Sequence, residues 1–226
     1  LYAQKGQISS KDILIISPNK VFADYISNVL PELGEETVPE TSMGQILSDV
    51  IDNKYKHQNF FEQVTELLEN PTPDFIERIQ YKASFEFISL LDKFILYMEN
   101  NYFKATDIKL TKYITIPAEF INEQFKRFHR YPIRQRFETM TDYILEMMQL
   151  QYNLTVSTPE KNQLKKEIKK MFVGNNDLQI YKDFFEWIGK PEMFKTRKNR
   201  ILEYADLAPL AYLHIALNGN NAQSYV

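Results

Sequence analysis

The sequence predicts a mostly α-helical fold that includes a short α/β piece near its N-terminal end. Hydrophobic residues make up 44% of the 226 residues and recur at helical spacing over most of the chain, while only 6 residues are glycine. The exception is residues 12–16, Asp-Ile-Leu-Ile-Ile, a continuous apolar run rich in β-branched residues. Such a run is typical of a strand that is buried on both faces of a parallel sheet.

A turn and a helix follow this predicted strand. Residues 17–19, Ser-Pro-Asn, interrupt the apolar run, and the next apolar side chains stand at helical spacing until Pro31 and Gly34 end the pattern. Strand, turn and helix make up half of a β-α-β unit. Because a lone parallel strand leaves its backbone groups unpaired, we expect its neighbours to lie outside this chain or to pair weakly within it.

Helical spacing dominates from about residue 44 onward. Residues 108–116 interrupt it, because they are rich in β-formers and predict a strand or a small hairpin. Pro117 is then expected to open a helix that runs toward Phe128. Before this interruption the pattern predicts one long core helix, in which apolar side chains recur every three or four positions: Ile76, Ile79, Ala83, Phe87, Leu90, Phe94 and Met98.

Four more helices are predicted after residue 130. Pro132 is expected in the first turn of one helix, and Thr158-Pro159-Glu160 is expected to cap and begin the next. The last two are predicted at about residues 177–188 and 203–217. The side chains that the first two helices should bury are Ile133, Phe137, Met140, Ile144 and Met148, followed by Leu164, Ile168 and Phe172.

Charge and composition exclude several classes of function. The 27 Lys and Arg residues face 30 Asp and Glu residues, and the net charge of −3 gives no overall basic field, so any contact with nucleic acid must be local. The chain has no cysteine, which excludes disulfides, thiolate nucleophiles and cysteine zinc sites, and which favours a cytoplasmic location. No apolar run approaches the roughly 20 residues of a membrane span, so no membrane partner is expected.

Signatures of catalysis are also missing from the sequence. It contains no phosphate loop, no dinucleotide-binding glycine motif, no zinc-protease motif and no serine-hydrolase elbow. His57, His129 and His214 lie far apart and have no partner at metal-ligand spacing, so ordinary surface or hydrogen-bonded roles are favoured. We therefore expect no catalytic residue, no metal ligand and no bound cofactor within this chain.

The first candidate binding site is the turn Ser17, Pro18, Asn19 and Lys20. It follows the carboxyl end of the predicted strand and precedes a helix, which is where open α/β sheets collect ligands and where helical N–H groups meet phosphate. The alternative is that proline and asparagine only shape a tight turn. Residue chemistry alone favours this second interpretation.

The second candidate site is the most basic stretch of the chain, residues 126–136. Aromatic side chains alternate here with cations, a composition suited to phosphate contact and base stacking, although a solvated surface is an equally good interpretation. The lysine-rich stretch at residues 161–170 is better interpreted as the solvated face of a helix. The five cations of the basic stretch are Lys126, Arg127, Arg130, Arg134 and Arg136.

Residues 11–36, KDILIISPNKVFADYISNVLPELGEE, closely resemble the HelD family of UvrD-like helicase-related ATPases. That family places a strand, a Ser-Pro-Asn turn and a helix ending in Leu-Pro-x-Leu-Gly-Glu soon after its Walker A helix. Residues 204–213 are similar to the helix that leads into the Walker B strand of the family. The positions that carry the first match are Phe22, Tyr25, Ile26, Leu30, Pro31, Leu33, Gly34 and Glu35.

The resemblance implies a domain organisation. Residues 1–45 would belong to the first RecA-like domain after the Walker A helix, and residues 46–200 would form the helical insertion that the family carries in this domain. Residues 201–226 would return to the RecA-like domain and end just before Walker B. A start at Leu1 without methionine and an end at Val226 agree with the expectation that the chain is a piece of a longer protein.

The resemblance also implies a function. Ser17, Pro18, Asn19 and Lys20 would correspond to a helicase motif that touches a single-stranded nucleic-acid backbone, and Thr41 with Ser42 to the next such motif. Pro18 stands where the UvrD pattern has threonine, beside a missing aromatic residue, so base stacking by this turn is not expected. The longer protein would bind ATP and Mg²⁺, whereas this chain, without either Walker motif, is not expected to hydrolyse ATP.

Three interpretations of the longer protein follow. By resemblance, HelD-type motors act on RNA polymerase and DNA and release stalled polymerase, with the insertion reaching into the main channel of the enzyme. The alternative is a true UvrD-like DNA-unwinding helicase whose insertion grips DNA through residues 126–136. A helical adaptor unrelated to ATPases is the third interpretation.

Overall fold

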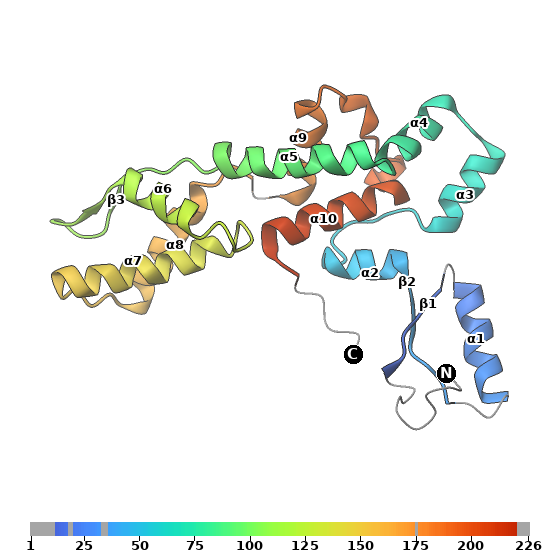
Figure 1. The fold of residues 1–226 in the computed structure, drawn as a ribbon, viewed down its shortest axis with the longest axis horizontal. Coiled ribbons are helices and arrows are strands. Elements are labelled where there is room, and N and C mark those ends of the chain that lie inside the picture. The colour runs from blue at the N-terminus through green and yellow to red at the C-terminus, as the bar shows by residue number, and fades with distance from the viewer. Residues whose placement is uncertain (1–11, 18–19, 33–35, 175, 221–226) are drawn as a thin grey trace. The chain divides into compact units, whose positions relative to one another are not determined.

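The computed structural model describes residues 12–17, 20–32, 36–174 and 176–220 of the chain (Figure 1). Over these ranges it contains ten α-helices and two sheets of two strands each, which confirms the predicted mostly α fold with few strands. The chain forms two compact units. The first unit holds the described residues up to Ser84 together with Met193–Ala211, and the second holds Phe85–Glu192 and Tyr212–Asn220.

The first unit begins with a complete β-α-β unit. Strand β1 (Ile15–Ser17) leads through helix α1 (Lys20–Glu32) to strand β2 (Glu40–Ser42), and the strands pair in parallel with Ser17 opposite Ser42. The strand predicted at residues 12–16 is therefore shorter and displaced toward Ser17, and its partner lies within the chain. Pro31 lies inside the last turn of α1 instead of ending the helix.

Three helices follow β2 in the first unit. Helix α2 (Met43–Val50) starts directly at the end of β2, and its N-cap is Ser42. Helix α3 (Phe60–Glu69) opens with a capping box, in which Asn59 and Glu62 satisfy each other's backbone N–H groups. Helix α4 (Pro73–Lys82) has proline in its first turn, where a missing N–H costs nothing.

The segment Met193–Ala211 also belongs to the first unit, and buried ion pairs join it to α4. Two short 3₁₀ turns, η4 (Lys198–Arg200) and η5 (Tyr204–Asp206), precede helix α10 (Leu207–Asn218). Glu203 accepts hydrogen bonds from Arg78 at 2.6 Å and from Lys82 at 3.0 Å, and Lys82 also lies 2.6 Å from Asp206. All four side chains are buried, and two cations balance two carboxylates.

The prediction of one long helix between residues 76 and 98 is wrong. Helix α4 ends at Lys82 and helix α5 (Phe85–Asn101) begins three residues later. The cause is Ser84, whose backbone N–H and hydroxyl both donate to the carbonyl of Tyr81, at 3.0 and 2.7 Å. A serine that bonds the backbone of the preceding turn competes with continuation of the helix.

The second unit has two aromatic clusters in its core. In the first, Phe87 and Phe94 of α5 contact Phe184 of helix α9 (Asp177–Trp187), with ring centroids 5.2 and 5.5 Å apart. In the second, Phe103 stacks on Phe125 at 4.1 Å. The apolar positions predicted to face the core after residue 130 are buried, including Ile144, Ile168 and Phe172. Among those predicted between residues 76 and 98, Phe87, Phe94 and Met98 are buried, Ile76, Ile79 and Leu90 are half-buried, and Ala83 is exposed.

A hairpin and three helices complete the second unit. Strands β3 (Ile108–Lys109) and β4 (Thr115–Ile116) pair antiparallel, as the β-rich stretch predicted. Helix α6 (Ala118–Arg127) follows Pro117, as expected. Helix α8 (Thr158–Lys170) begins with a capping box between Ser157 and Glu160, so its cap is Ser157 and Thr158, which was expected to cap it, is its first residue. Helix α7 (Arg136–Tyr152) packs against α6 and α8.

The start of α7 differs from the prediction. Pro132 is not in its first turn, because the helix begins four residues later, at Arg136. The backbone N–H groups of Ile133 and Arg134 instead donate to Ala216 and Leu217 in the last turn of α10, at 3.2 and 2.8 Å. Carbonyls at the end of a helix have no partner within that helix, so residues 133–134 satisfy them from outside.

Candidate nucleic-acid interface

Two predicted site residues meet at the carboxyl edge of the small parallel sheet. Ser17 is the last residue of β1 and Ser42 the last residue of β2, and they stand opposite each other in the strand register. Parallel strands end at the same edge, which is the edge where open α/β sheets bind ligands. Tertiary structure thus joins the two segments that were singled out separately in the sequence.

A pocket of about 320 Å³ opens at this edge. Ser17, Ser42 and the first turn of α2 form one side, and the chain entering α3 and the η5 turn form the other. We call it the carboxyl-edge pocket. Its lining residues are Ser17, Ser42, Met43, Gly44, Gln45, His57, Asn59, Phe60 and Tyr204.

The polar side of the carboxyl-edge pocket is the first turn of α2. The Ser42 hydroxyl accepts a hydrogen bond from the backbone N–H of Gln45 at 3.1 Å and so caps the helix. A helix start carries partial positive charge and N–H groups without partners in the helix, which suits an anion such as phosphate. This side of the pocket therefore offers hydroxyl and N–H donors.

The other side is aromatic. The rings of Phe60 and Tyr204 meet edge to face with centroids 5.7 Å apart. A Cβ added to Gly44 would lie 3.2 Å from Cε2 of Tyr204, so the tyrosine ring rests against the first turn of α2. Burial raises the pKa of Tyr204, which keeps its hydroxyl neutral. The pocket thus combines hydrogen-bond donors with aromatic surface.

His57 also lines the pocket, and backbone pairing with the segment before η5 holds it there. It forms an isolated parallel bridge with Leu202, and Gln58 donates its N–H to the carbonyl of Leu202 at 2.9 Å. The Nδ1 atom of His57 lies 2.8 Å from the carbonyl of Gln58. Within the described ranges, no group of three or more His, Asp or Glu side chains is placed to hold a metal ion.

Of the other four predicted residues near this edge, the structure describes Thr41 and the backbone of Lys20. Thr41 lies in the middle of β2 and is partly exposed. Lys20 is the first residue of α1. Pro18 and Asn19 lie outside the described residues. Of the predicted site residues, Ser17 and Ser42 therefore line the pocket, and a contribution of the turn between β1 and α1 stays a prediction.

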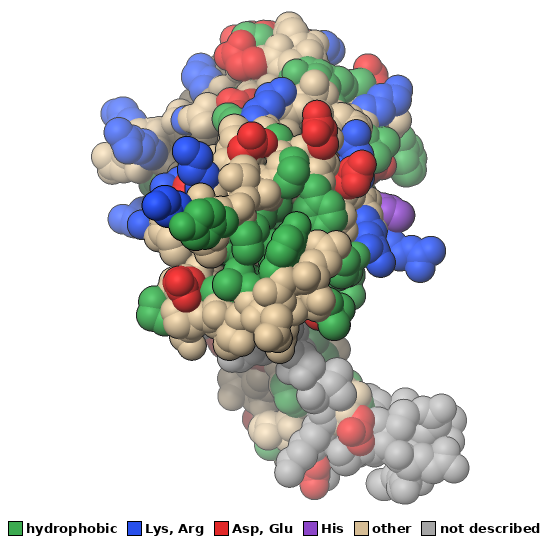
Figure 2. Space-filling model, turned by 90° about the vertical axis from the view of Figure 1, so that its left-hand side faces the viewer, with side chains coloured by type: hydrophobic (Ala, Val, Ile, Leu, Met, Phe, Trp, Pro, Cys, Tyr) green, Lys and Arg blue, Asp and Glu red, His purple; other side chains and the backbone are tan. Residues whose placement is uncertain are grey.

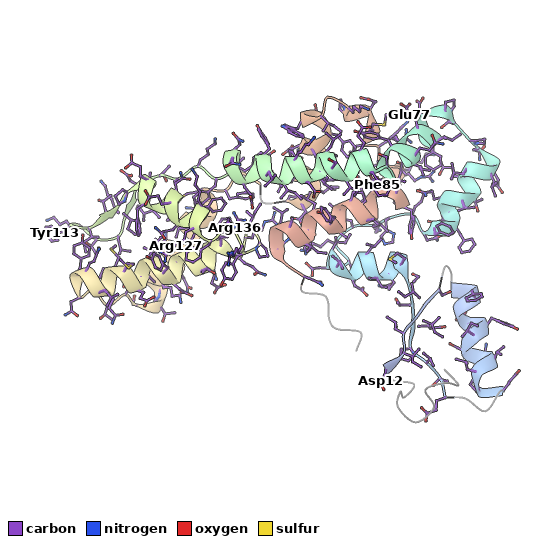
Figure 3. All side chains as sticks on the ribbon, viewed as in Figure 1. Asp12, Glu77, Phe85, Tyr113, Arg127 and Arg136 are labelled. Carbon is purple, nitrogen blue, oxygen red and sulfur yellow. The ribbon has the colours of Figure 1, made fainter. Side chains whose placement is uncertain are left out.

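The basic stretch at residues 126–136 divides into two groups. Arg136 is only 3% exposed, pairs with Glu99 and donates to the carbonyls of Tyr131 and His129 at 2.8 and 2.9 Å (Figure 3). Its guanidinium group also lies 5.1 Å from the ring centre of Phe125. This arginine is therefore part of the core of the second unit.

Arg134 is also engaged inside the second unit. Its guanidinium group contacts Asp177 at 2.5 Å and the carbonyl of Gly174 at 3.0 Å. The other oxygen of Asp177 lies 2.6 Å from Nδ1 of the buried His214, and Asn218 donates to the His214 carbonyl. This network gives Arg134 and His214 structural partners.

Lys126, Arg127 and Arg130 are exposed. Arg127 donates to the hydroxyl of Tyr143 at 2.6 Å and lies 4.6 Å above its ring. Phe128 touches the rings of both Tyr131 and Tyr143. Arg127 therefore lies against aromatic rings, and the exposed Lys126 and Arg130 stand close to it in the sequence. Such a set suits contact with a nucleic-acid backbone or an acidic partner.

Sequence patterns missed the aromatic side of the carboxyl-edge pocket. The spacing of Asn59 and Glu62 is a capping box, which signals that a helix starts at Phe60. No local pattern reports that Tyr204, far later in the chain, lies beside that helix start. Only the long-range fold brings Phe60, Tyr204 and Gly44 together.

Neither a scan against protein-family models nor a search of the curated proteins found a match to this chain. None of the helices in the described ranges has the length and apolar content required to cross a bilayer.

Proposed function

We propose that this chain is part of an ATP-driven, HelD-like motor that acts on RNA polymerase and nucleic acid and releases stalled polymerase. In this proposal ATP and Mg²⁺ bind to other parts of the longer protein, and the chain contributes a nucleic-acid contact at the carboxyl-edge pocket. One observation carries the proposal: Ser17 and Ser42, taken from two separate helicase-like motifs, line one pocket at the edge of one parallel sheet.

The pocket supports contact with a phosphodiester backbone. The serine hydroxyls and the N–H groups of the first turn of α2 are donors suited to phosphate oxygens. With a net charge of −3, the chain has no general attraction for nucleic acid, so binding depends on such local donors. Contacts of this kind position a strand without selecting its sequence.

A second candidate function is DNA unwinding by a UvrD-like helicase whose helical part grips DNA. The observation in its favour is the exposed set Lys126, Arg127 and Arg130 beside Phe128 and Tyr131. Cations beside aromatic rings suit phosphates and bases of a single strand. The same surface also fits an acidic face of a protein, so the partner separates the two functions.

The contact at Ser42 is tested by comparing Ser42→Asp with Ser42→Asn. Both side chains cap helices well, so both variants keep α2 intact, but only aspartate places a negative charge at the pocket. We expect Ser42→Asp to weaken binding of a labelled single-stranded oligonucleotide about tenfold relative to Ser42→Asn. Fluorescence anisotropy at low salt measures the affinity, and equal affinities of the two variants would remove the pocket from nucleic-acid binding.

Salt dependence and polymerase capture separate the two candidate functions. Polymerase recycling predicts retention of the chain on immobilised RNA polymerase together with weak DNA affinity. DNA unwinding predicts DNA binding that falls steeply with salt. In that case, Gln at positions 126, 127 and 130 should lower the slope of log affinity against log salt by roughly two, since each lost single-strand phosphate contact removes about 0.7.

A further inference from the structure

A groove runs along the outer edge of the hairpin strand β3 in the second unit. Its volume is about 360 Å³, within the usual range of ligand pockets. Residues 106–110 form one wall, and Glu160, Gln163, Leu164 and Glu167 of α8 form the other. No residue of β4 lines the groove, so it lies on the side of β3 that faces away from β4. We call it the β3 groove.

The hydrogen-bond pattern of the hairpin directs backbone groups into this groove. Leu110 donates its N–H to the carbonyl of Ile114 at 3.0 Å, and Ile108 stands opposite Ile116. In an antiparallel pair, alternate residues direct N–H and C=O toward the partner strand and away from it. Lys109, between Ile108 and Leu110, therefore directs both backbone groups toward the outer edge.

The facing wall is one side of helix α8. Glu160, Gln163, Leu164 and Glu167 are spaced by three, one and three residues, which places them on one helix face. Leu164 is buried and provides an apolar floor, to which Met171 adds. The groove thus has a strand edge on one side and an amphipathic helix face on the other.

The charge of the groove is negative. Asp107, Glu160 and Glu167 contribute three carboxylates, against the ammonium groups of Lys109 and of Lys170, which lies 2.9 Å from Glu167. Hydrogen bonds within the chain use one oxygen of each carboxylate: Oε2 of Glu160 accepts from Ser157, and Oδ1 of Asp107 accepts from Ala118. Oε1 of Glu167 accepts from Gln163 and Lys170. Hydrogen bonds from Ser157 lower the pKa of Glu160, so it stays ionised at neutral pH.

The end of the second unit that carries β3 faces the viewer in Figure 2. Hydrophobic side chains gather in the middle of this face, and charged side chains surround them. An apolar centre with a charged rim is the usual composition of a surface that binds another chain.

We propose that the β3 groove binds an extended peptide segment, which adds as a strand to the outer edge of β3 and places a lysine or arginine side chain against the carboxylates of α8. The main-chain hydrogen bonds of Lys109 supply the strand pairing, Leu164 and Met171 receive an apolar side chain, and Asp107, Glu160 and Glu167 select the cation. The proposal requires neither ATP nor nucleic acid and stands apart from the carboxyl-edge pocket.

The test uses the full chain and the synthetic peptide Val-Thr-Val-Lys-Val-Thr-Val carrying a fluorescent label. We expect binding that is about tenfold tighter than that of the same peptide with glutamate in place of lysine. A version that is N-methylated at alternate backbone nitrogens, so that it cannot pair with a strand edge, should lose binding. Asp107→Asn and Glu167→Gln should weaken only the lysine peptide.

Lys109→Pro removes the outward N–H of β3 from the protein, as N-methylation removes N–H groups from the peptide. Proline is tolerated in an edge strand where the N–H points outward, so the hairpin bonds to β4 should survive while the ladder to the peptide is lost. Lys109→Ala keeps the N–H and removes the ammonium group, so it should bind the lysine peptide at least as tightly as the parent chain does. Equal binding of the N-methylated peptide, equal binding of the glutamate peptide, or no binding of any peptide would each overturn the proposal.

Discussion

The role of each arginine between residues 126 and 136 depends on what surrounds its guanidinium group. Arg136 has a carboxylate, two backbone carbonyls and an aromatic ring as partners, and it is buried. Arg130 is exposed. A buried cation with this many partners belongs to the fold, because removing it leaves several acceptors without a donor.

Arg136 and Arg130 are therefore expected to respond differently to replacement by glutamine. Arg136→Gln should lower the free energy of unfolding by about 2 to 3 kcal/mol, because charged hydrogen bonds are lost in a buried place. Arg130→Gln, the matched control, should change it by less than about 0.5 kcal/mol. Urea unfolding followed by circular dichroism measures both values. Similar values for the two variants would mean that the buried contacts of Arg136 do not stabilise the chain.

The lowered pKa of Glu203 makes the stability of the fold depend on pH. Burial alone would raise its pKa, but the hydrogen bonds from Arg78 and the charge and hydrogen bond of Lys82 outweigh burial, and the net pKa is lowered. A carboxyl group with a lower pKa in the folded chain than in the unfolded chain stabilises the fold at pH values above its ordinary pKa. This contribution is lost as pH falls below the ordinary value of 4.5 and through the lowered pKa.

Acid unfolding of the chain should therefore depend on Glu203. We expect the melting temperature of the parent chain to fall as pH decreases from about 5 toward about 3, and Glu203→Gln to flatten this part of the curve. Glu77→Gln, which removes an exposed carboxylate of α4, the helix that carries Arg78 and Lys82, should leave the curve unchanged. A Glu203→Gln curve parallel to that of the parent chain would contradict the role of this ion cluster.

Two glycines that follow helices have positive φ angles but differ in the space around them. Gly174, after α8, has a φ of 143°, and a Cβ there would lie 2.9 Å from Cδ1 of Ile180. Gly189, after α9, has a φ of 70°, and a Cβ there would meet nothing within 4 Å. Both positions favour glycine through backbone conformation, but only the first adds a steric conflict.

Alanine at these two positions should separate backbone strain from steric conflict. Gly189→Ala should cost about 1 kcal/mol of unfolding free energy, the price of a left-handed residue with a side chain. Gly174→Ala should cost more, about 2 to 4 kcal/mol, because overpacking against Ile180 is added to the strain. Chemical denaturation of the two variants measures the difference. Equal losses of unfolding free energy would show that the core around Ile180 accommodates the added methyl group without further destabilisation.

Local sequence signals predicted the starts of α6 and α8. Pro117 directly precedes α6 and Pro159 lies in the first turn of α8, as predicted, because the fixed backbone angle of proline favours a helix start locally. The break between α4 and α5 was missed because the apolar spacing continues through Ser84. The delayed start of α7 was missed because its cause, the end of α10, lies far away in the sequence.

At the scale of the molecule, distant segments assemble each candidate site. The carboxyl-edge pocket draws on β1, β2, α3 and the η5 turn, and the β3 groove draws on a hairpin and on α8. The two compact units divide the chain near residues 84, 192 and 211. The domain boundaries predicted from resemblance, at residues 45 and 200, stay predictions.

The sequence by itself determined the helical class, the hairpin and the buried apolar positions of α7 and α8. These follow from periodicity, capping and turn chemistry, which depend on residues close together in the chain. Only tertiary structure decided that β2 completes the first β-α-β unit, that Arg134 and Arg136 face inward, and that Phe60 and Tyr204 share a pocket. The reason is physical: pairing, burial and ion contacts depend on distances in space, and a single sequence does not report which of its distant residues will meet.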